Sequence, residues 1–180
     1  MTETTGHALT SEPALSLRSE TAADRPAIRD LLLSVFPSPG EADLVEQLRG
    51  DDALVTALVA EAADRRLHGY VAFSRVHVES ADHLEPATAL APLAVALDDR
   101  HRGIGYALVR AGLTALAARG ERLVFALGNP DYYSRFGFST AAASAFPSPY
   151  AGPNFLALRL LAGAPESGRL RYPAAFDQLS

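Results

Sequence analysis

The chain has 180 residues, a length that suits one domain with a sizeable hydrophobic core. Its 16 basic and 21 acidic residues give a formal net charge of −5, which argues against a general binder of nucleic acid or of membrane surfaces. There is no cysteine, so disulfides, a thiolate metal site and a cysteine nucleophile are all excluded.

The N-terminal segment is polar and short of large apolar side chains. It lacks the basic and then apolar pattern of a signal peptide, and no run in the chain approaches the roughly 20 apolar residues of a membrane span. We therefore expect a cytoplasmic protein with no membrane partner. Residues 1–14 are predicted to form a flexible N-terminal tail, and residues 15–180 a single domain.

In the first half of the chain, segments with the apolar spacing of a strand alternate with segments that have the spacing of a helix. A helix capped by Thr21 would place Ile28, Leu31, Leu32 and Val35 on one face and end at Pro37. The other elements expected here are a strand over 14–18, a helix over 41–49, strands over 54–61 and 67–78, a loop over 79–85 and a strand over 87–97.

The second half contains the clearest helix of the sequence. Ile104, Leu108, Ala111 and Ala115 recur at helical spacing, and Gly120 provides a C-terminal stop. We further expect a strand over 123–127, a short helix over 131–136 and a strand over 155–161. Antiparallel strands followed by a strand, helix, strand crossover predict an α+β (mixed α/β) fold, in which helices flank a central mixed and mostly antiparallel sheet.

The junction between the strand over 87–97 and the long helix has the features of a phosphate site. Gly103 and Gly105 let the backbone approach a ligand closely. The first turn of the helix that follows leaves N–H groups unpaired and carries a partial positive charge. An anion, most simply a pyrophosphate, is the expected ligand.

Two familiar phosphate motifs do not fit this turn. A P-loop needs a lysine after its second glycine, and the chain contains no lysine. A dinucleotide fingerprint needs a third small residue where this chain has Leu108. A metal site is not expected either, because His68, His77 and His83 lack the i, i+4 spacing of zinc ligands.

Two segments resemble one enzyme family. The pattern Arg100-x-x-Gly103-x-Gly105 is similar to the acyl-CoA pyrophosphate signature of the GCN5-related N-acetyltransferases (GNAT). The segment 129–138, with an asparagine and then a tyrosine four residues before Gly-Phe, resembles a later motif of that family, and the tail over 168–176 resembles its YhbS-like subgroup. The likeness spans roughly residues 15–177.

The resemblance implies a GNAT fold that uses acetyl-CoA or another acyl-CoA as co-substrate and needs no metal. Backbone N–H groups from His101 to Ala107 would hold the pyrophosphate, and Arg100 and Arg102 either add charge there or are solvated side chains. The cofactor-binding residues expected from the likeness are Leu93, Ala94, Val95, Arg100, His101, Arg102, Gly103, Ile104, Gly105, Tyr106, Ala107, Asn129 and Tyr133.

The strand over 93–95 is where the family adds the pantetheine arm to its sheet. Pro92 cannot donate a backbone hydrogen bond, so either the sheet is splayed at this point or Pro92 marks a strand end. A splayed sheet would leave backbone N–H groups free to polarise the thioester carbonyl.

Tyr133 matches the family tyrosine that protonates the departing thiolate, and it is the predicted catalytic residue. A phenol with an ordinary pKa of about 10 is protonated at neutral pH, as a general acid must be. The alternative for Tyr133 is a place in an aromatic core. Asn129 either contacts the cofactor or caps the short helix through its side chain.

A general base is missing from the strand over 87–97, which contains no ionisable residue. Candidates at its approaches are His77, Glu79, Asp82, His83 and Glu85. The implied function is therefore direct transfer of an acetyl group to a primary amine of a small molecule or peptide, by a monomer or homodimer. The alternative is a catalytically inactive acyl-CoA-binding sensor or interaction protein.

Overall fold

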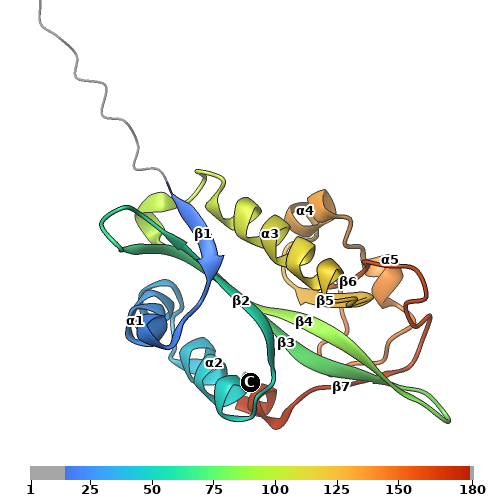
Figure 1. Ribbon diagram of the computed structural model, residues 1–180. Coiled ribbons are helices and arrows are strands. Elements are labelled where there is room, and N and C mark those ends of the chain that lie inside the picture. Colours follow the sequence, from blue (N-terminus) through green and yellow to red (C-terminus); the bar gives the residue numbers. More distant parts are fainter. Residues whose placement is uncertain (1–14, 179–180) are drawn as a thin grey trace, which may run out of the picture.

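A computed structural model of the chain describes residues 15–178. The predicted tail over 1–14 lies outside the described residues. Figure 1 shows a twisted sheet with α1 and α2 on one face and α3 on the other. The strands are β1 (Ser16–Ser19), β2 (Leu54–Glu61), β3 (Leu67–Glu79), β4 (Leu84–Val95), β5 (Leu123–Leu127), β6 (Phe155–Arg159) and β7 (Arg169–Arg171).

The helices occupy the connections between these strands. They are α1 (Arg25–Val35), α2 (Gly40–Gly50), α3 (Ile104–Ala118), α4 (Pro130–Tyr133) and α5 (Thr140–Ala143), with short 3₁₀ turns η1 (Ala22–Asp24), η2 (Leu97–Asp99), η3 (Ser134–Phe136) and η4 (Ala174–Gln178). No described helix is long and apolar enough to cross a membrane.

The sheet confirms the predicted α+β fold with a mixed, mostly antiparallel sheet. Its order is β1-β2-β3-β4-β5-β6, and β7 pairs with β3. Only the β4–β5 pair is parallel among the described strands. β7 pairs with His77–Glu79 of β3, beyond the last residue of β3 that β2 reaches, so it continues the line of β2.

Three apolar clusters hold the helices on the sheet. Ile28 and Leu32 of α1 pack with Val59 and Tyr70 on one face, and all four are almost fully buried. On the other face α3 lies so close to the sheet that a Cβ at Gly112 would stand 2.2 Å from the Phe73 ring. Each large apolar side chain that is fully buried stabilises the fold by about 1.5–3 kcal/mol, before the conformational entropy lost on folding is subtracted.

The sheet opens between β4 and β5. The two strands pair only from Thr88↔Val124 to Leu90↔Ala126, although β4 continues to Val95. Opposite the opening, the β3–β4 register shifts between Val71↔Leu93 and Phe73↔Leu90, which leaves Ala91 and Pro92 facing one residue of β3. The peptide bond between Ala91 and Pro92 is cis. Pro92 therefore lies in a bulge within a strand, and the predicted splay is confirmed.

One expectation about local structure was wrong, and two short elements were not foreseen. The region 79–85 was expected to be a loop, but β3 and β4 extend to Glu79 and Leu84 and pair across a tight hairpin. The short elements α5 and β7 were not predicted.

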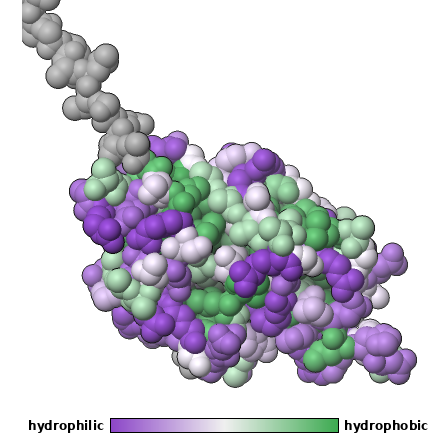
Figure 2. All heavy atoms as spheres, viewed as in Figure 1, coloured by the Kyte–Doolittle hydropathy of each residue, from purple (hydrophilic) through white to green (hydrophobic). Residues whose placement is uncertain are grey.

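The outer surface is polar with scattered apolar residues. Figure 2 shows one face, on which separate green apolar patches are surrounded by purple hydrophilic residues. The exposed large hydrophobic residues come from separate elements: Leu17, Leu33, Leu84, Leu97, Tyr106, Leu127 and Leu161.

Candidate acyl-CoA site

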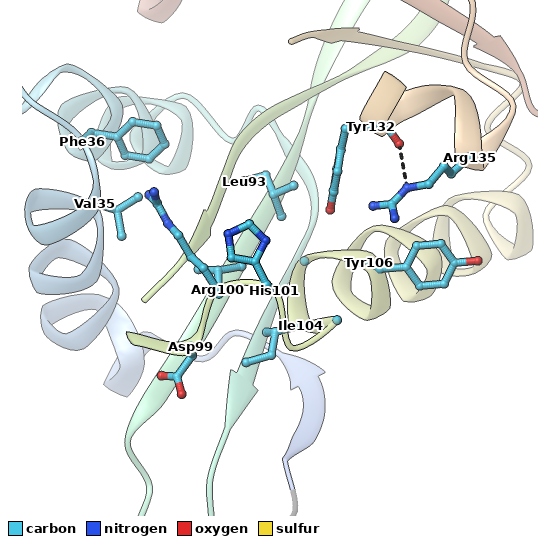
Figure 3. Close-up of a pocket in the computed structure, with 13 residues that line it drawn as sticks. Val35, Phe36, Leu93, Asp99, Arg100, His101, Ile104, Tyr106, Tyr132 and Arg135 are labelled. Carbon is cyan, nitrogen blue, oxygen red and sulfur yellow. Dashed lines mark hydrogen bonds between the residues drawn. The ribbon is translucent and has the colours of Figure 1, made fainter. Parts of the chain in front are cut away.

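A large cavity lies at the open end of the sheet, with a volume of about 570 Å³. This is within the range of cofactor and small-molecule sites. It is bounded by the end of α1, the second half of β4, the turn before α3, and the α4–η3 segment (Figure 3). Its lining residues are Val35, Phe36, Leu93, Val95, Asp99, Arg100, His101, Gly103, Ile104, Gly105, Tyr106, Tyr132 and Arg135.

The turn at 100–105 has a backbone suited to an anion. His101 and Gly103 adopt left-handed conformations, with φ of 65° and 80°. Gly103 is the N-cap of α3, and no side chain caps this helix within the described structure. Successive N–H groups in such a turn form a concave anion site, and the helix dipole strengthens it. The positive φ of His101 is unusual for a residue with a Cβ, and such strain concentrates at functional sites.

The Asp99 carboxylate connects this turn to strand β3. One oxygen lies 2.6 Å from Nδ1 of His68 on β3, and the other accepts a 2.6 Å hydrogen bond from Arg102. Asp99 and His68 are both buried. Hydrogen bonding to His68 and then the charges of His68 and Arg102 hold the pKa of Asp99 below its ordinary value, against the opposing effect of burial. Asp99 is thus ionised and paired at neutral pH.

Tyr132 and Arg135 form the opposite wall. The Tyr132 hydroxyl points toward the start of α3, where a Cβ at Gly105 would stand 2.8 Å from it (Figure 3). The Arg135 guanidinium lies 4.8 Å from the Tyr132 ring centroid and 5.6 Å from that of Tyr106, and its Nε donates to the Tyr132 carbonyl at 3.3 Å. Arg135 therefore brings a positive charge to the cavity wall.

Eight of the predicted cofactor-binding residues line this cavity: Leu93, Val95, Arg100, His101, Gly103, Ile104, Gly105 and Tyr106. In Figure 3, Arg100 extends across the cavity toward Val35. The outer edge of β4 after Leu90 is not paired with any described strand, as strand-like binding of an extended arm requires.

The other predicted residues are placed differently. The N–H of Ala107 donates to the Gly103 carbonyl at 2.9 Å, so it is not available to a phosphate, which corrects the sequence-based expectation. The Ala94 side chain is buried on the α1 side of the sheet. Arg102 is paired with Asp99. Asn129 caps α4 by accepting from the Asp131 N–H at 2.9 Å, the second of its two predicted roles.

Tyr133, the predicted catalytic residue, does not line this cavity. Its side chain is 7% exposed and its ring is close to Gly128, where a Cβ would meet a ring carbon at 2.6 Å. Tyr133 belongs to the same apolar cluster as Leu90 and Ala126, the last paired residues of β4 and β5. Burial raises its pKa above the ordinary value. Tyr133 is therefore a core aromatic residue beside the last paired residues of β4 and β5, and its role as proton donor stays a prediction.

The candidate bases lie away from this cavity. None of His77, Glu79, Asp82, His83 and Glu85 is among its lining residues. Glu79 pairs with Arg171, and Glu85 pairs with Arg122 at 3.1 Å. Within residues 15–178, no three acidic or histidine side chains are grouped as metal ligands would be.

Sequence reasoning did not assign to the site Tyr132, Arg135, Val35 at the end of α1, or Phe36, which follows it. The i, i+3 spacing of Tyr132 and Arg135 places them on one side of the α4–η3 segment, which was a usable signal. No residue of the first helix was singled out for the cofactor site.

Comparison with known proteins agrees with this geometry. The family model described as an acetyltransferase (GNAT) domain matches residues 16–141. The chain belongs to the GNAT acetyltransferase family. It is 44% identical over 128 residues to the uncharacterized N-acetyltransferase YhbS of Escherichia coli strain K12, an alignment that covers 70% of this chain and 74% of YhbS. It is 33% identical over 133 residues to the uncharacterized N-acetyltransferase YjhQ of the same strain, covering 73% and 74%.

Solved GNAT structures extend the similarity to nearly the whole chain. A crystal structure of E. coli YhbS in complex with CoA superposes with a TM-score of 0.84 at 35% identity, covering 95% of this chain and 96% of YhbS. A GNAT acetyltransferase from Brucella melitensis in complex with acetyl-CoA superposes with a TM-score of 0.77 at 30% identity, covering 92% and 100%. The expected family and fold are thereby confirmed.

Proposed function

We propose that this GNAT chain is an N-acetyltransferase that binds acetyl-CoA in the large cavity and transfers the acetyl group directly to a primary amine. The observation that carries the proposal is the uncapped start of α3 behind the left-handed residues His101 and Gly103, facing a cavity of about 570 Å³. The CoA and acetyl-CoA complexes of the two similar structures support it.

In this proposal the cofactor spans the cavity. The pyrophosphate accepts from N–H groups at the start of α3, with Arg100 and Arg135 adding positive charge. The pantetheine arm lies along the unpaired edge of β4 at 93–95. Its thioester then reaches the opening beside the Ala91–Pro92 bulge, where a backbone N–H on the edge of β4 that no described strand covers would polarise the carbonyl.

The transfer step needs two proton movements. The neutral amine nitrogen attacks the thioester carbon, so that a C–N bond forms, the C–S bond breaks and the nitrogen loses a proton to water. The thiolate takes up a proton, for which we propose Tyr133 as donor. The Tyr133 phenol is protonated at neutral pH, as a proton donor must be, since its ordinary pKa is about 10 and burial raises it.

A matched pair of glycines tests the binding site. Gly103 is the N-cap of α3, and Gly120 follows the C-terminal end of the same helix. Both have a φ of 80°, and neither has a described atom within 4 Å of an added Cβ. Replacing either by leucine should cost similar stability. Only Gly103→Leu should abolish the gain in melting temperature that saturating acetyl-CoA gives the wild type. Absence of acetyl-CoA binding to the wild type by calorimetry would refute the proposal.

Neighbouring tyrosines test the proton donor. Tyr133→Phe should lower kcat for acetyl transfer by tenfold or more while leaving the Kd for acetyl-CoA unchanged. Tyr132→Phe, on the wall of the cavity, should leave kcat within about twofold. A Tyr133→Phe variant with wild-type turnover would remove Tyr133 from the mechanism.

The second candidate function is an acyl-CoA-binding sensor without catalysis. It is favoured by the lining of the large cavity. Asp99 is the only carboxylate among the described residues that line it, and Asp99 is already paired with His68 and Arg102. A wild-type protein that binds acetyl-CoA but releases no thiol with any amine tested would support this function instead.

A further inference from the structure

A second, smaller cavity lies beside the proposed thioester position. It has a volume of about 60 Å³ and borders the last paired residues of β4 and β5. Its lining residues are Ala89, Leu90, Ala91, Phe125, Ala126, Leu127, Tyr150, Phe155, Tyr172 and Phe176. Ala91 lines this cavity and Leu93 lines the large one, so the two cavities meet β4 only two residues apart, or at most about 7 Å along the strand.

The described residues that line the small cavity are half aromatic and half aliphatic, and none of them carries a formal charge. Phe125 stacks on Phe155 with ring centroids 5.6 Å apart, and Tyr172 lies 5.1 Å from Tyr150 and 5.0 Å from Phe176. The Tyr150 hydroxyl donates to the Phe176 carbonyl at 3.1 Å, so it is already engaged. Burial raises the pKa of Tyr172 to about 12, and burial followed by the charge of Asp177 raises that of Tyr150. Both phenols are neutral at physiological pH.

The geometry points to an acceptor that is a small monoamine, in which a compact apolar group carries the primary amino group. This inference rests on the proposed acetyl transfer and deepens it. The apolar group would fill the small cavity, and the amino group would face the thioester across the Ala91–Pro92 bulge.

Charge is what separates this class of acceptor from others. A second ammonium group, as in a polyamine, would enter a cavity whose described lining residues include no carboxylate, and burying an unpaired charge is strongly unfavourable. The same surroundings favour the neutral form of the attacking amine, because desolvation disfavours its protonated form. The lining can therefore promote deprotonation that a dedicated base would otherwise perform.

Leu127 is a suitable position for mutation. It lines the cavity but is 54% exposed, so a polar substitution there should not disturb the core. Leu127→Asp adds a carboxylate at the rim, and Leu127→Asn adds polarity without charge. Leu84→Asp is the matched control, since Leu84 is 59% exposed at the hairpin end of β4 and lines neither cavity.

The experiment compares two amines of similar length, 3-methylbutylamine and 1,4-diaminobutane, by thiol release from acetyl-CoA. We expect the wild type to have a kcat/KM at least tenfold higher for the monoamine. Leu127→Asp should lower this ratio at least tenfold, Leu127→Asn should lower monoamine activity without a gain for the diamine, and Leu84→Asp should retain the wild-type ratio.

Calorimetry with acetyl-CoA separates the two proposals. A wild type that binds acetyl-CoA but prefers the diamine or a peptide N-terminus, or that acetylates neither amine, overturns the inference about the acceptor while leaving cofactor binding intact. The inference is also overturned if Leu127→Asp still binds acetyl-CoA and has the same ratio of kcat/KM for monoamine over diamine as the wild type. A wild type that does not bind acetyl-CoA overturns the proposed function itself.

Discussion

Nδ1 of His68 lies 2.6 Å from a carboxylate oxygen of Asp99, and this contact joins β3 to the turn that precedes α3. The two residues are 31 positions apart. An ionised carboxylate accepts only, so Nδ1 must carry the hydrogen. The second Asp99 oxygen accepts from Arg102, which lies within the turn itself. A buried carboxylate thus fixes the backbone whose N–H groups face the cavity.

Asp99→Asn should therefore weaken acetyl-CoA binding although Asp99 need not touch the cofactor. Losing a partner in a buried hydrogen-bonded group costs about 1–3 kcal/mol, and part of that cost should appear as a five- to tenfold higher Kd measured by calorimetry. The neighbouring Asp98, which is exposed on the same 3₁₀ turn, provides the control Asp98→Asn. Equal affinities in the two variants would show that the His68–Asp99 contact does not position the turn.

Gly105 and Tyr132 should be energetically coupled. A Cβ at Gly105 would stand 2.8 Å from the Tyr132 hydroxyl, which is closer than real contacts allow. Gly105→Ala should raise the Kd for acetyl-CoA about tenfold by displacing the Tyr132 ring. In a Tyr132→Phe background the same substitution should cost roughly 1 kcal/mol less, a typical coupling for residues in contact.

Calorimetry on the four proteins of this cycle measures the coupling. Gly50→Ala is the control, because Gly50 ends α2 and has no described atom within 4 Å of an added Cβ. Strictly additive effects of Gly105→Ala and Tyr132→Phe would mean that the two side chains do not compete for this space.

Arg135 should contribute to affinity mainly through charge. It lies over the Tyr132 and Tyr106 rings at the cavity wall, and a guanidinium held in this way is pre-organised for a phosphate. Arg135→Gln should raise the Kd for acetyl-CoA about tenfold at low ionic strength and less at high ionic strength, because salt screens the lost attraction. Binding measured over a salt series tests this expectation, with Arg159→Gln on β6 as a control. An unchanged Kd at low salt would contradict it.

The sequence predicted the elements whose signals are local. The long helix was clear because Ile104, Leu108, Ala111 and Ala115 share one face, and the phosphate turn was clear because Gly103 directly precedes that helix. Pro92 indicated the opening of the sheet because a proline cannot take part in a full ladder. Each of these features depends on residues within about one helical turn or on the chemistry of one residue.

The remaining features depend on contacts between distant segments. β7 has only three residues, Arg169–Arg171, and becomes a strand because β3 offers an unpaired edge beyond β2. Tyr132 and Tyr133 are adjacent, so no local pattern decides which of them faces the cavity; packing of Tyr133 against Gly128 decides it. The same is true of Val35 and Phe36, which reach the site only after α1 packs on the sheet.

Stability should depend on the ion pairs that join β1, η1 and β2. Arg18 donates to both Asp24 oxygens at 2.7 and 2.8 Å and to both Glu61 oxygens at 2.9 and 3.0 Å. Asp24 is 7% exposed and also accepts from the N–H and hydroxyl of Thr21. Hydrogen bonding to Arg18 is the main cause that holds the pKa of Asp24 well below its ordinary value.

Asp24→Asn should accordingly lower the free energy of unfolding by about 1–3 kcal/mol at pH 7, or about 3–8 °C in melting temperature for a domain of this size. A carboxylate with a lowered pKa stabilises the fold above its unfolded pKa of about 4, and this stabilisation is lost as the pH falls toward the folded value. The difference between wild type and variant should be complete at pH 6–7 and shrink from about pH 5 downward. Asp43→Asn should change little, because Asp43 and its partner Arg29 are 45% and 41% exposed. Melting curves from pH 7 to pH 3 test this, and a difference that grows on acidification would mean that the Arg18–Asp24 pair is not its source.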